Sequence, residues 1–254
     1  MIPVIIPVYG KPEQVERCLR HLHAQTVPVE IYQRDNNVDN VFFTAALNEG
    51  ILHYLHQPCD YIVLLNQDMY LEPDAIEQMV RFMNQQPNCG IGTPLEQLAN
   101  GPEGQVLAGG LEAFPFGVHR TGPAPQFAHN APINWANGSC MILRKTMIQD
   151  IGLLDKNLVF IGSDSDYCFT ARARGWEVWR IGAARGLHEH GQSGATENPE
   201  IQLLKIKDML YFGDKWLTGG LYRLLAHEPD KYSHEDIRSF IRQLHQAREQ
   251  LTPV

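Results

Sequence analysis

The chain contains 254 residues, and its 21 Lys and Arg against 29 Asp and Glu give a formal net charge of −8 at pH 7. Hydrophobic residues make up 44% and charged residues 20%, which is ordinary for a globular protein and excludes a disordered or collagen-like chain. The acidic balance argues against binding to nucleic acid, which requires a basic face that neutralises phosphates. The length predicts one α/β domain of roughly 250 residues.

Targeting signals and paired cysteines are both missing from the sequence. No apolar run approaches the roughly 18 residues of a transmembrane segment, and the first residues lack the basic region of a signal peptide. The five cysteines are odd in number and form no CxxC pair, a pattern typical of reduced structural thiols. We therefore expect a cytoplasmic protein, and the sequence leaves its oligomeric state open.

Short apolar runs alternate with amphipathic stretches through the first hundred residues. The pattern predicts strands at 3–8, 29–33, 61–66 and 89–95, and helices from Pro12, over 41–56 and over 73–86. Such alternation predicts a parallel, doubly wound sheet, whose ligands bind beyond the carboxyl ends of the strands. The residues that follow Pro7, Gln33 and Leu65 are therefore the first candidates for function.

The pattern changes after residue 95. Residues 96–136 are rich in Gly and Pro and lack helical periodicity, which predicts hairpins and a long loop. Beyond them we expect strands at 139–143 and 176–181, and helices at 145–150, 164–174, 200–217 and 234–250.

Two acidic residues follow predicted strands. Asp35, in the Arg-Asp-Asn-Asn segment 34–37, can accept a hydrogen bond from a base or ribose, or it can form an Asx turn. Turn preferences alone favour the turn by about two to one. Asp68 ends the Asn-Gln-Asp segment 66–68 after the most apolar strand, where a carboxylate can bind a hard divalent cation that is shared with substrate phosphates. It lies too far upstream of Pro73 to cap the next helix, so we favour a functional role.

Two further pairs of polar residues lie in the second half. Asp164 and Asp166 point to different faces of the predicted helix, because residues two apart are about 200° around its axis. One of them can cap the helix while the other serves as a general base, and double N-capping is the purely structural alternative. His188 and His190 lie two apart on an extended segment, so both can approach one metal ion.

Several motifs follow one another in a recognisable order and spacing. They are VIIPVY at 4–9, Asp35-Asn36, the helix pattern at 40–51, Asn66-Gln67-Asp68, Trp135 with Gly138-Ser-Cys-Met141, Gly162-Ser-Asp-Ser-Asp166 with Arg172, Gly175 and Trp176, His188-x-x-Gly191-x-Ser193, and Lys215-Trp216. With these motifs the chain, from residue 3 to about 219, resembles the family 2 glycosyltransferases, inverting and rhamnosyltransferase-like enzymes with the GT-A fold. Asn66-Gln67-Asp68 stands at the position of the family's DxD motif.

The resemblance implies a fold and a domain arrangement. The expected fold class is α/β, with a Rossmann-like, mostly parallel central sheet flanked by helices. Residues 1–219 form the expected GT-A domain, with a nucleotide-binding half at 1–95 and an acceptor and catalytic half at 96–199. Residues 200–254 are expected to be a helical extension packed on the same domain.

The resemblance also implies residue roles. The residues expected to bind the donor nucleotide are Pro7, Tyr9, Asp35, Asn36, Asn66, Gln67 and Asp68. Asp68 is expected to hold Mn²⁺ or Mg²⁺ together with His188 or His190, and Asp164 matches the general base. The implied reaction is metal-dependent, inverting transfer of a sugar from a nucleotide-diphosphate sugar to a hydroxyl of a glycan, glycolipid or protein.

Three substitutions separate this chain from the family pattern. Asn66 replaces the first Asp of the DxD motif, Ser163 replaces a Glu, and Phe42 replaces a Gly. Asn66 and Ser163 support, as an alternative, a non-catalytic relative that binds sugar or nucleotide, whereas the retained Asp68, Asp164 and His188 favour an enzyme. A sugar nucleotidyltransferase is disfavoured, because residues 9–12 are too poor in Gly to form its phosphate loop. The sequence specifies neither the donor sugar nor the acceptor.

Overall fold

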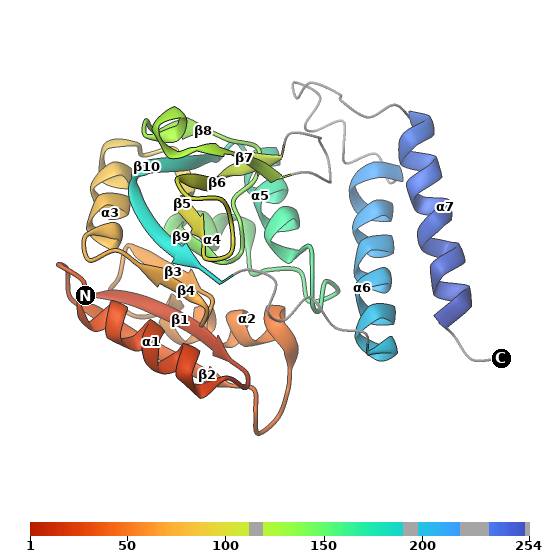
Figure 1. Ribbon diagram of the computed structural model, residues 1–254, viewed down its shortest axis with the longest axis horizontal. Coiled ribbons are helices and arrows are strands. Elements are labelled where there is room, and N and C mark those ends of the chain that lie inside the picture. Colours follow the sequence, from red (N-terminus) through yellow and green to blue (C-terminus); the bar gives the residue numbers. More distant parts are fainter. Residues whose placement is uncertain (112–118, 190–197, 219–233, 252–254) are drawn as a thin grey trace.

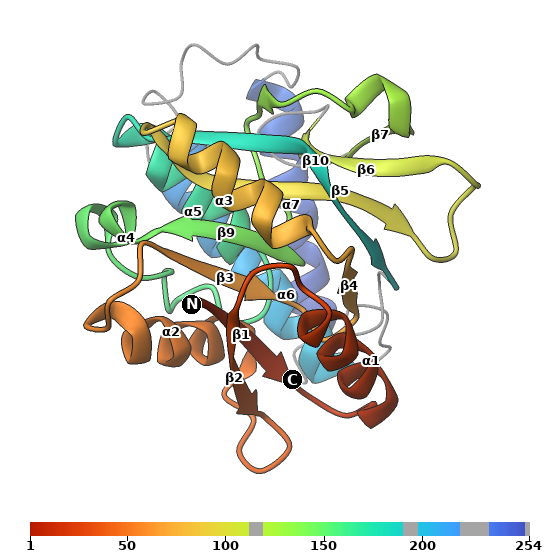
Figure 2. The same cartoon turned by 90° about the vertical axis from the view of Figure 1, so that its left-hand side faces the viewer.

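A ten-stranded sheet with helices on both faces forms the centre of the structure (Figures 1 and 2). The computed structural model describes residues 1–111, 119–189, 198–218 and 234–251. Along the main path of the sheet the strands follow the order β2 (Val29–Asp35), β1 (Ile2–Val8), β3 (Tyr61–Leu65), β9 (Cys140–Arg144), β5 (Cys89–Leu98), β10 (Glu177–His188) and β4 (Met69–Leu71). Beside this path, β6 (Gln105–Leu111) pairs with β5 and β7 (His119–Pro123), and β8 (Ala131–Pro132) pairs with β10.

Strand directions make the sheet mixed. β1 runs parallel to β2 and β3, and β5 runs parallel to β10, as the alternation of strands and helices predicts. β9 lies antiparallel between β3 and β5, and the short strand β4, absent from the prediction, is antiparallel to β10. The expected α/β architecture is confirmed, with β2, β1 and β3 forming one parallel group and β5 and β10 a second parallel pair.

Two hydrophobic clusters lie on opposite faces of the sheet, because side chains alternate along each strand. In β1, Ile5 belongs to one cluster, and Val4 and Ile6 belong to the other. The first face is covered by α2 (Phe42–Leu55), α4 (Lys145–Ile151) and α5 (Ser163–Ala173), and the second by α1 (Pro12–His23) and α3 (Ala75–Gln85) (Figure 2). Each helix begins close to its predicted position, so the apolar periodicity identified the buried faces correctly.

The strand β10 is longer than predicted, and its length positions a histidine. The sequence predicts a strand at 176–181, but β10 continues to His188 after a register shift against β5 between Ile181 and Arg185. The end of β10 then pairs with β4, where His188 lies opposite Met69. This pairing brings the histidine next to the segment that follows β3.

The C-terminal helices lie side by side at one end of the molecule (Figure 1). α6 (Pro199–Phe212) continues into a π-helical turn (Gly213–Thr218), and α7 (His234–Leu251) packs along α6. Phe212 and Trp216 pack against Phe169 of α5. Their ring centroids lie 5.7 and 5.5 Å, respectively, from that of Phe169. Among the helices that the structure describes, none is both long and apolar enough to cross a bilayer.

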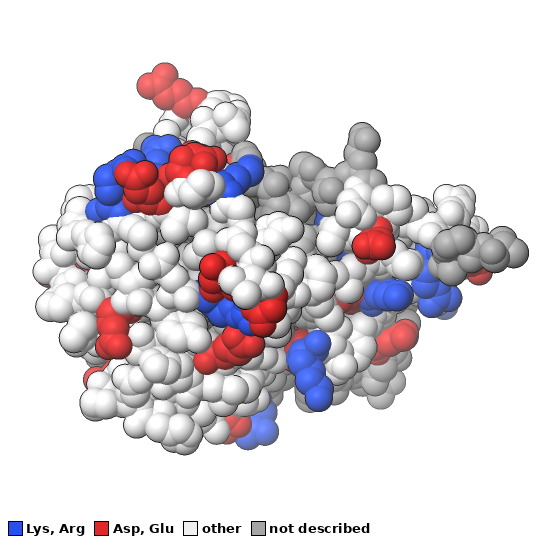
Figure 3. Space-filling model, turned by 90° about the horizontal axis from the view of Figure 1, so that it is seen from below, with Lys and Arg blue, Asp and Glu red and all other residues white. Residues whose placement is uncertain are grey.

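The distribution of charged side chains and the state of the cysteines are as the composition indicates. Over the described part of the face in Figure 3, acidic and basic side chains gather in small mixed clusters. All five cysteines are free thiols, and all but the half-buried Cys59 are buried. Burial raises the pKa of Cys18 to about 12, so this thiol is inert at neutral pH.

Candidate active site

The first part of the candidate site lies beyond the carboxyl ends of β1 and β3. The side chain of Gln67 joins the two strand ends: its Oε1 accepts from the amide of Tyr9 at 2.8 Å, and its Nε2 donates to the Tyr9 carbonyl at 3.1 Å. The Tyr9 residue itself is 60% exposed, so its ring is available to a ligand. Pro7, in β1, pairs with Arg34 of β2. Gln67 thus shapes the loop, and its polar atoms are occupied by the protein.

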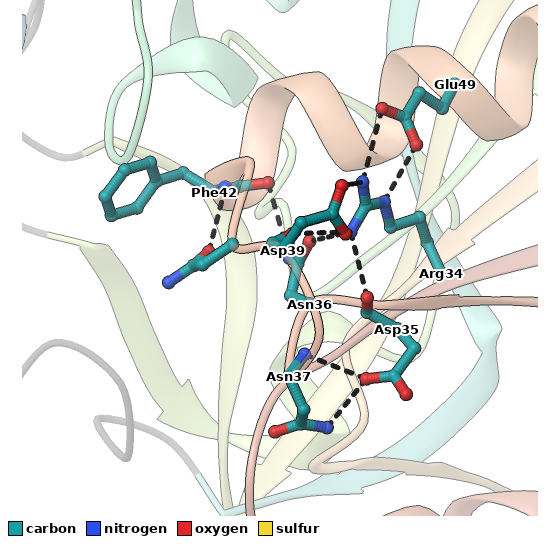
Figure 4. A network of polar contacts seen from close by, with 8 residues as sticks. Arg34, Asp35, Asn36, Asn37, Asp39, Phe42 and Glu49 are labelled. Atoms are coloured by element: carbon teal, nitrogen blue, oxygen red, sulfur yellow. Dashed lines mark hydrogen bonds and ion pairs between the residues drawn. The ribbon is translucent and has the colours of Figure 1, made fainter.

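The loop that follows β2 is organised from inside by Arg34 (Figure 4). The buried guanidinium donates to Asp39 Oδ1 at 2.7 Å, to Glu49 Oε2 at 2.8 Å and to Asn36 Oδ1 at 3.0 Å. The hydrogen bonds that Arg34 donates to the carboxylates of Glu49 and Asp39 raise its pKa further above its usual range. Asn36, expected at the nucleotide, is 5% exposed, and its side chain belongs to this network.

Asp35 forms the Asx turn that its sequence context favours. Its Oδ1 accepts from both the amide and the side-chain nitrogen of Asn37, each at 2.8 Å (Figure 4). The residue is exposed at the end of β2. Because the turn uses Oδ1, the turn and the ligand interpretations are compatible: Oδ2 points away from Asn37.

The second part of the site consists of Asp68 and His188. Asp68 is 6% exposed, and its Oδ1 lies 3.5 Å from Nε2 of His188, which is 4% exposed. The other ring nitrogen of the histidine, Nδ1, lies 2.8 Å from Oε2 of Glu96 in β5. Burial alone would lower the pKa of His188, but the hydrogen bonds to Asp68 and Glu96 outweigh it and raise the pKa to about 9.

Asn66 shapes the site through hydrogen bonds of its backbone. Its amide donates to the Ser139 carbonyl at 2.8 Å, and its carbonyl accepts from the amide of Met69 at 3.1 Å. The second bond closes a turn over residues 66–69 that directs Asp68 toward β10. His190, the other predicted metal ligand, lies outside the described residues. Within the described ranges no group of three or more His, Cys, Asp or Glu side chains is arranged to hold a metal ion.

The third part of the site is the predicted base, Asp164, in the first turn of α5. Its Oδ2 accepts from the amide of Gly138 at 3.0 Å, and its Oδ1 accepts from the amide of Ser165 at 2.8 Å. Burial raises the pKa of Asp164, although both amide hydrogen bonds oppose the rise. A Cβ at position 138 would lie 3.2 Å from that of Asp164, which explains a glycine there.

Asp166 has a structural role. It is 2% exposed, and its Oδ1 lies 2.7 Å from both Nζ of Lys215 and Nε1 of Trp216. The expectation that one of the two aspartates caps the helix is wrong, because Gly162 occupies the N-cap position with φ 78°. With Asp166 bound to Lys215, Asp164 is the remaining candidate base.

The turn at residues 137–139 joins these parts. Asn137 Nδ2 donates to Glu96 Oε2 at 3.2 Å, the Gly138 amide binds Asp164, and the Ser139 carbonyl binds Asn66. The sequence analysis missed Glu96 and Asn137. The available signal was an acidic residue directly after the apolar run 89–95.

Comparisons with known proteins show the family of the chain. A family model described as glycosyltransferase-like family 2 matches residues 4–196, most of the chain. The chain belongs to that family.

Individual relatives are distant. Glucomannan 4-beta-mannosyltransferase 7 of Arabidopsis thaliana is 24% identical over 148 residues, which are 58% of this chain and 26% of the relative. The chain therefore spans about a quarter of the length of the curated relatives that it matches. The crystal structure of S. aureus TarS 1–349 in complex with UDP-GlcNAc aligns with a TM-score of 0.57 at 12% identity, and the alignment covers 98% of this chain and 72% of that TarS fragment. The crystal structure of GalNAc-T7 with UDP, GalNAc and Mn²⁺ aligns with a TM-score of 0.62 at 10% identity. The alignment covers 98% of this chain and 55% of the GalNAc-T7 chain. The fold is GT-A.

Proposed function

We propose that this chain is an inverting glycosyltransferase, which moves a sugar from a nucleotide-diphosphate donor to a hydroxyl of a glycan, glycolipid or protein. The observation that carries the proposal is the approach of Asp68 Oδ1 and His188 Nε2 to 3.5 Å at the carboxyl edge of the sheet. The turn at 137–139 holds Asp164 beside the same edge. Family membership over residues 4–196 supports the assignment.

The residues present fit a divalent cation. A carboxylate oxygen and an imidazole nitrogen face each other, and Mg²⁺ commonly binds through one or two carboxylates together with substrate phosphates. A set of two protein ligands, Asp68 and His188, is therefore sufficient when the donor diphosphate completes the shell. When bound, the cation supplies positive charge that stabilises the leaving diphosphate. The structural neighbour GalNAc-T7, crystallised with UDP, GalNAc and Mn²⁺, supports a divalent cation at such a site.

Asp164 acts as the general base in the proposed reaction. The acceptor hydroxyl gives its proton to the carboxylate as its oxygen bonds to the anomeric carbon, and the bond to the diphosphate breaks on the opposite face. Displacement from that face inverts the anomeric configuration. The raised pKa of Asp164 favours this role, since a base is most effective when its pKa approaches the working pH.

The donor nucleotide is oriented by the loops after β1 and β2. The exposed ring of Tyr9 offers a stacking surface, and Oδ2 of Asp35 offers an acceptor for a base or ribose. The Arg34 network holds the Asp35 loop in place before a ligand arrives.

The test is incubation with a panel of nucleotide-diphosphate sugars, with release of the nucleotide diphosphate as the readout. We expect slow hydrolysis of at least one donor, and loss of that activity in EDTA with recovery on addition of Mn²⁺. Full activity in the chelator would remove the metal from the proposal. Saturable donor binding without any release would favour the alternative, a non-catalytic sugar- or nucleotide-binding relative, which the substitutions Asn66 and Ser163 support.

A further inference from the structure

Glu96 is a carboxylate inside the central sheet. It lies in β5, opposite Gly186 of β10 and Leu107 of β6, and is 1% exposed. Burying a carboxylate is costly unless hydrogen bonds or a cation compensate it. Its Oε1 is buried and accepts no hydrogen bond from the described residues, so the satisfied oxygen, Oε2, carries its interactions.

Oε2 of Glu96 has two partners. It lies 2.8 Å from Nδ1 of His188 and accepts from Nδ2 of Asn137 at 3.2 Å. Oδ1 of Asn137 in turn accepts from the amide of Ser139 at 3.2 Å, which fixes the direction of the Asn137 side-chain amide. The carboxylate is thus held on one side by the turn at 137–139 and faces the imidazole on the other.

The contact with Glu96 determines how the imidazole ring of His188 is oriented toward Asp68. Because Nδ1 of the imidazole faces Glu96, the other ring nitrogen, Nε2, is directed toward Asp68, 3.5 Å away. A carboxylate behind a metal-binding histidine fixes its ring orientation and tautomer and raises its basicity as a ligand. A neutral hydrophobic residue at position 96 would fill space but leave the ring free to turn.

We propose that Glu96 is a positioning residue that holds His188 with Nε2 directed at the cation site of Asp68. The inference rests on the proposed metal-dependent transfer and adds a residue that its motifs do not include. Glu96 is 1% exposed and contacts His188, so it is proposed to act through the histidine.

The experiment measures Mn²⁺ affinity by electron paramagnetic resonance in the presence of nucleoside diphosphate. The full chain is compared with Glu96→Gln and Glu96→Ala, with a thermal melt for each protein. We expect Mn²⁺ affinity to fall on the order of 10–100-fold in Glu96→Ala. Glu96→Gln, which has almost the same shape and keeps one acceptor oxygen, should lose less.

Asp208→Asn is the matched control. Asp208 is as buried as Glu96, at 1% exposed, but it accepts from the amides of residues 159–161 and lies in α6. We expect its Mn²⁺ affinity to stay within threefold of the wild type even if the protein is less stable.

Three results would overturn the inference in distinguishable ways. If the wild type binds Mn²⁺ and folded Glu96→Ala or Glu96→Gln binds it equally well, Glu96 has no positioning role and the proposed function stands. If the wild type binds no Mn²⁺ with any nucleoside diphosphate, the proposed metal site fails and this inference fails with it. An equal loss of affinity in Asp208→Asn would show that the effect is general destabilisation.

Discussion

Replacing Lys215 with Met tests the ion pair that joins the C-terminal π-helical turn to α5. Nζ of Lys215 lies 2.8 Å from Oδ2 of Asp155 and 2.7 Å from Oδ1 of Asp166. Methionine keeps most of the length and the apolar part of the lysine side chain and removes only the charged end. The change therefore isolates the electrostatic contribution from packing.

The size of the effect follows from the burial of the partners. The side chain of Asp166 is 3% exposed and that of Asp155 is 18% exposed, so Lys215→Met leaves one fully buried carboxylate without its cation. Removing one partner of a buried ion pair costs about 3–5 kcal/mol. Asp166 keeps the indole N–H of Trp216, and Asp155 keeps the hydroxyl of Tyr211. We therefore expect the low end, about 3 kcal/mol.

The effect should also depend on pH. Burial raises the pKa of Asp166 even with Lys215 present, and loss of the cation raises it further. A carboxyl whose pKa is higher in the folded state binds protons preferentially when folded, so the variant gains stability as pH falls. The wild type has the opposite behaviour at Asp155: although burial opposes it, the hydrogen bond from Lys215 helps to lower its pKa to about 2, and that stabilisation is lost as pH falls below about 4. Both effects shrink the deficit of the variant in acid.

The assay is urea denaturation of wild type and Lys215→Met at several pH values from about 3 to 7, a range that extends below the ordinary aspartate pKa of about 4. Asp166→Asn and the double variant complete a double-mutant cycle, in which we expect a coupling energy above about 1 kcal/mol. A deficit below about 1 kcal/mol at pH 7, the range of exposed pairs, would refute the reasoning. So would a deficit that grows as the pH falls.

Three further outcomes test the site directly. Asp164→Asn should lower the transfer rate by about 10²–10⁴-fold and leave the Kd for nucleoside diphosphate, measured by calorimetry, within threefold; wild-type turnover would remove Asp164 as the base. The acid limb of kcat/KM against pH should have its midpoint above the ordinary aspartate pKa of about 4, because burial raises the pKa of Asp164; a midpoint at or below that value would contradict the assignment. Asp35→Ala should weaken binding of the preferred nucleoside diphosphate by about 10-fold, the loss of one hydrogen bond to a charged group, whereas an unchanged Kd would leave Asp35 with its turn alone.

The predictable part of the fold is the part determined by local pattern. Buried strands such as 61–65 and the helical stripe at 42–55 are visible as runs and periods in the sequence, so their existence and order follow. The direction of a strand cannot be predicted in this way, because a run of apolar residues has the same pattern in both directions. Nothing in the local sequence shows that residues 140–144 lie antiparallel between β3 and β5. The three-residue strand β4 is too short to show a period.

The candidate site likewise has a part that can be predicted from local sequence and a part that cannot. Asp68, Asp164 and His188 are predicted as candidates from the order of the motifs, and the structure brings Asp68 and His188 together. Glu96 was missed because its partner is 92 positions away in sequence and its contact depends on the pairing of β5 with β10. Asn36 was assigned to the ligand for a related reason: the internal network around Arg34 that occupies its side chain is not visible in local sequence.

The contact between α6 and the loop ahead of α5 has a consequence for protein engineering. The family match ends at residue 196, yet Asp208 accepts from three successive amides at 159–161, directly ahead of the helix that carries Asp164. A chimera that exchanges only the matched region between relatives would pair the loop of one protein with the helix of another. We expect such exchanges to preserve a functional base only when the donor fragment extends through residue 218, so that loop and helix are inherited together.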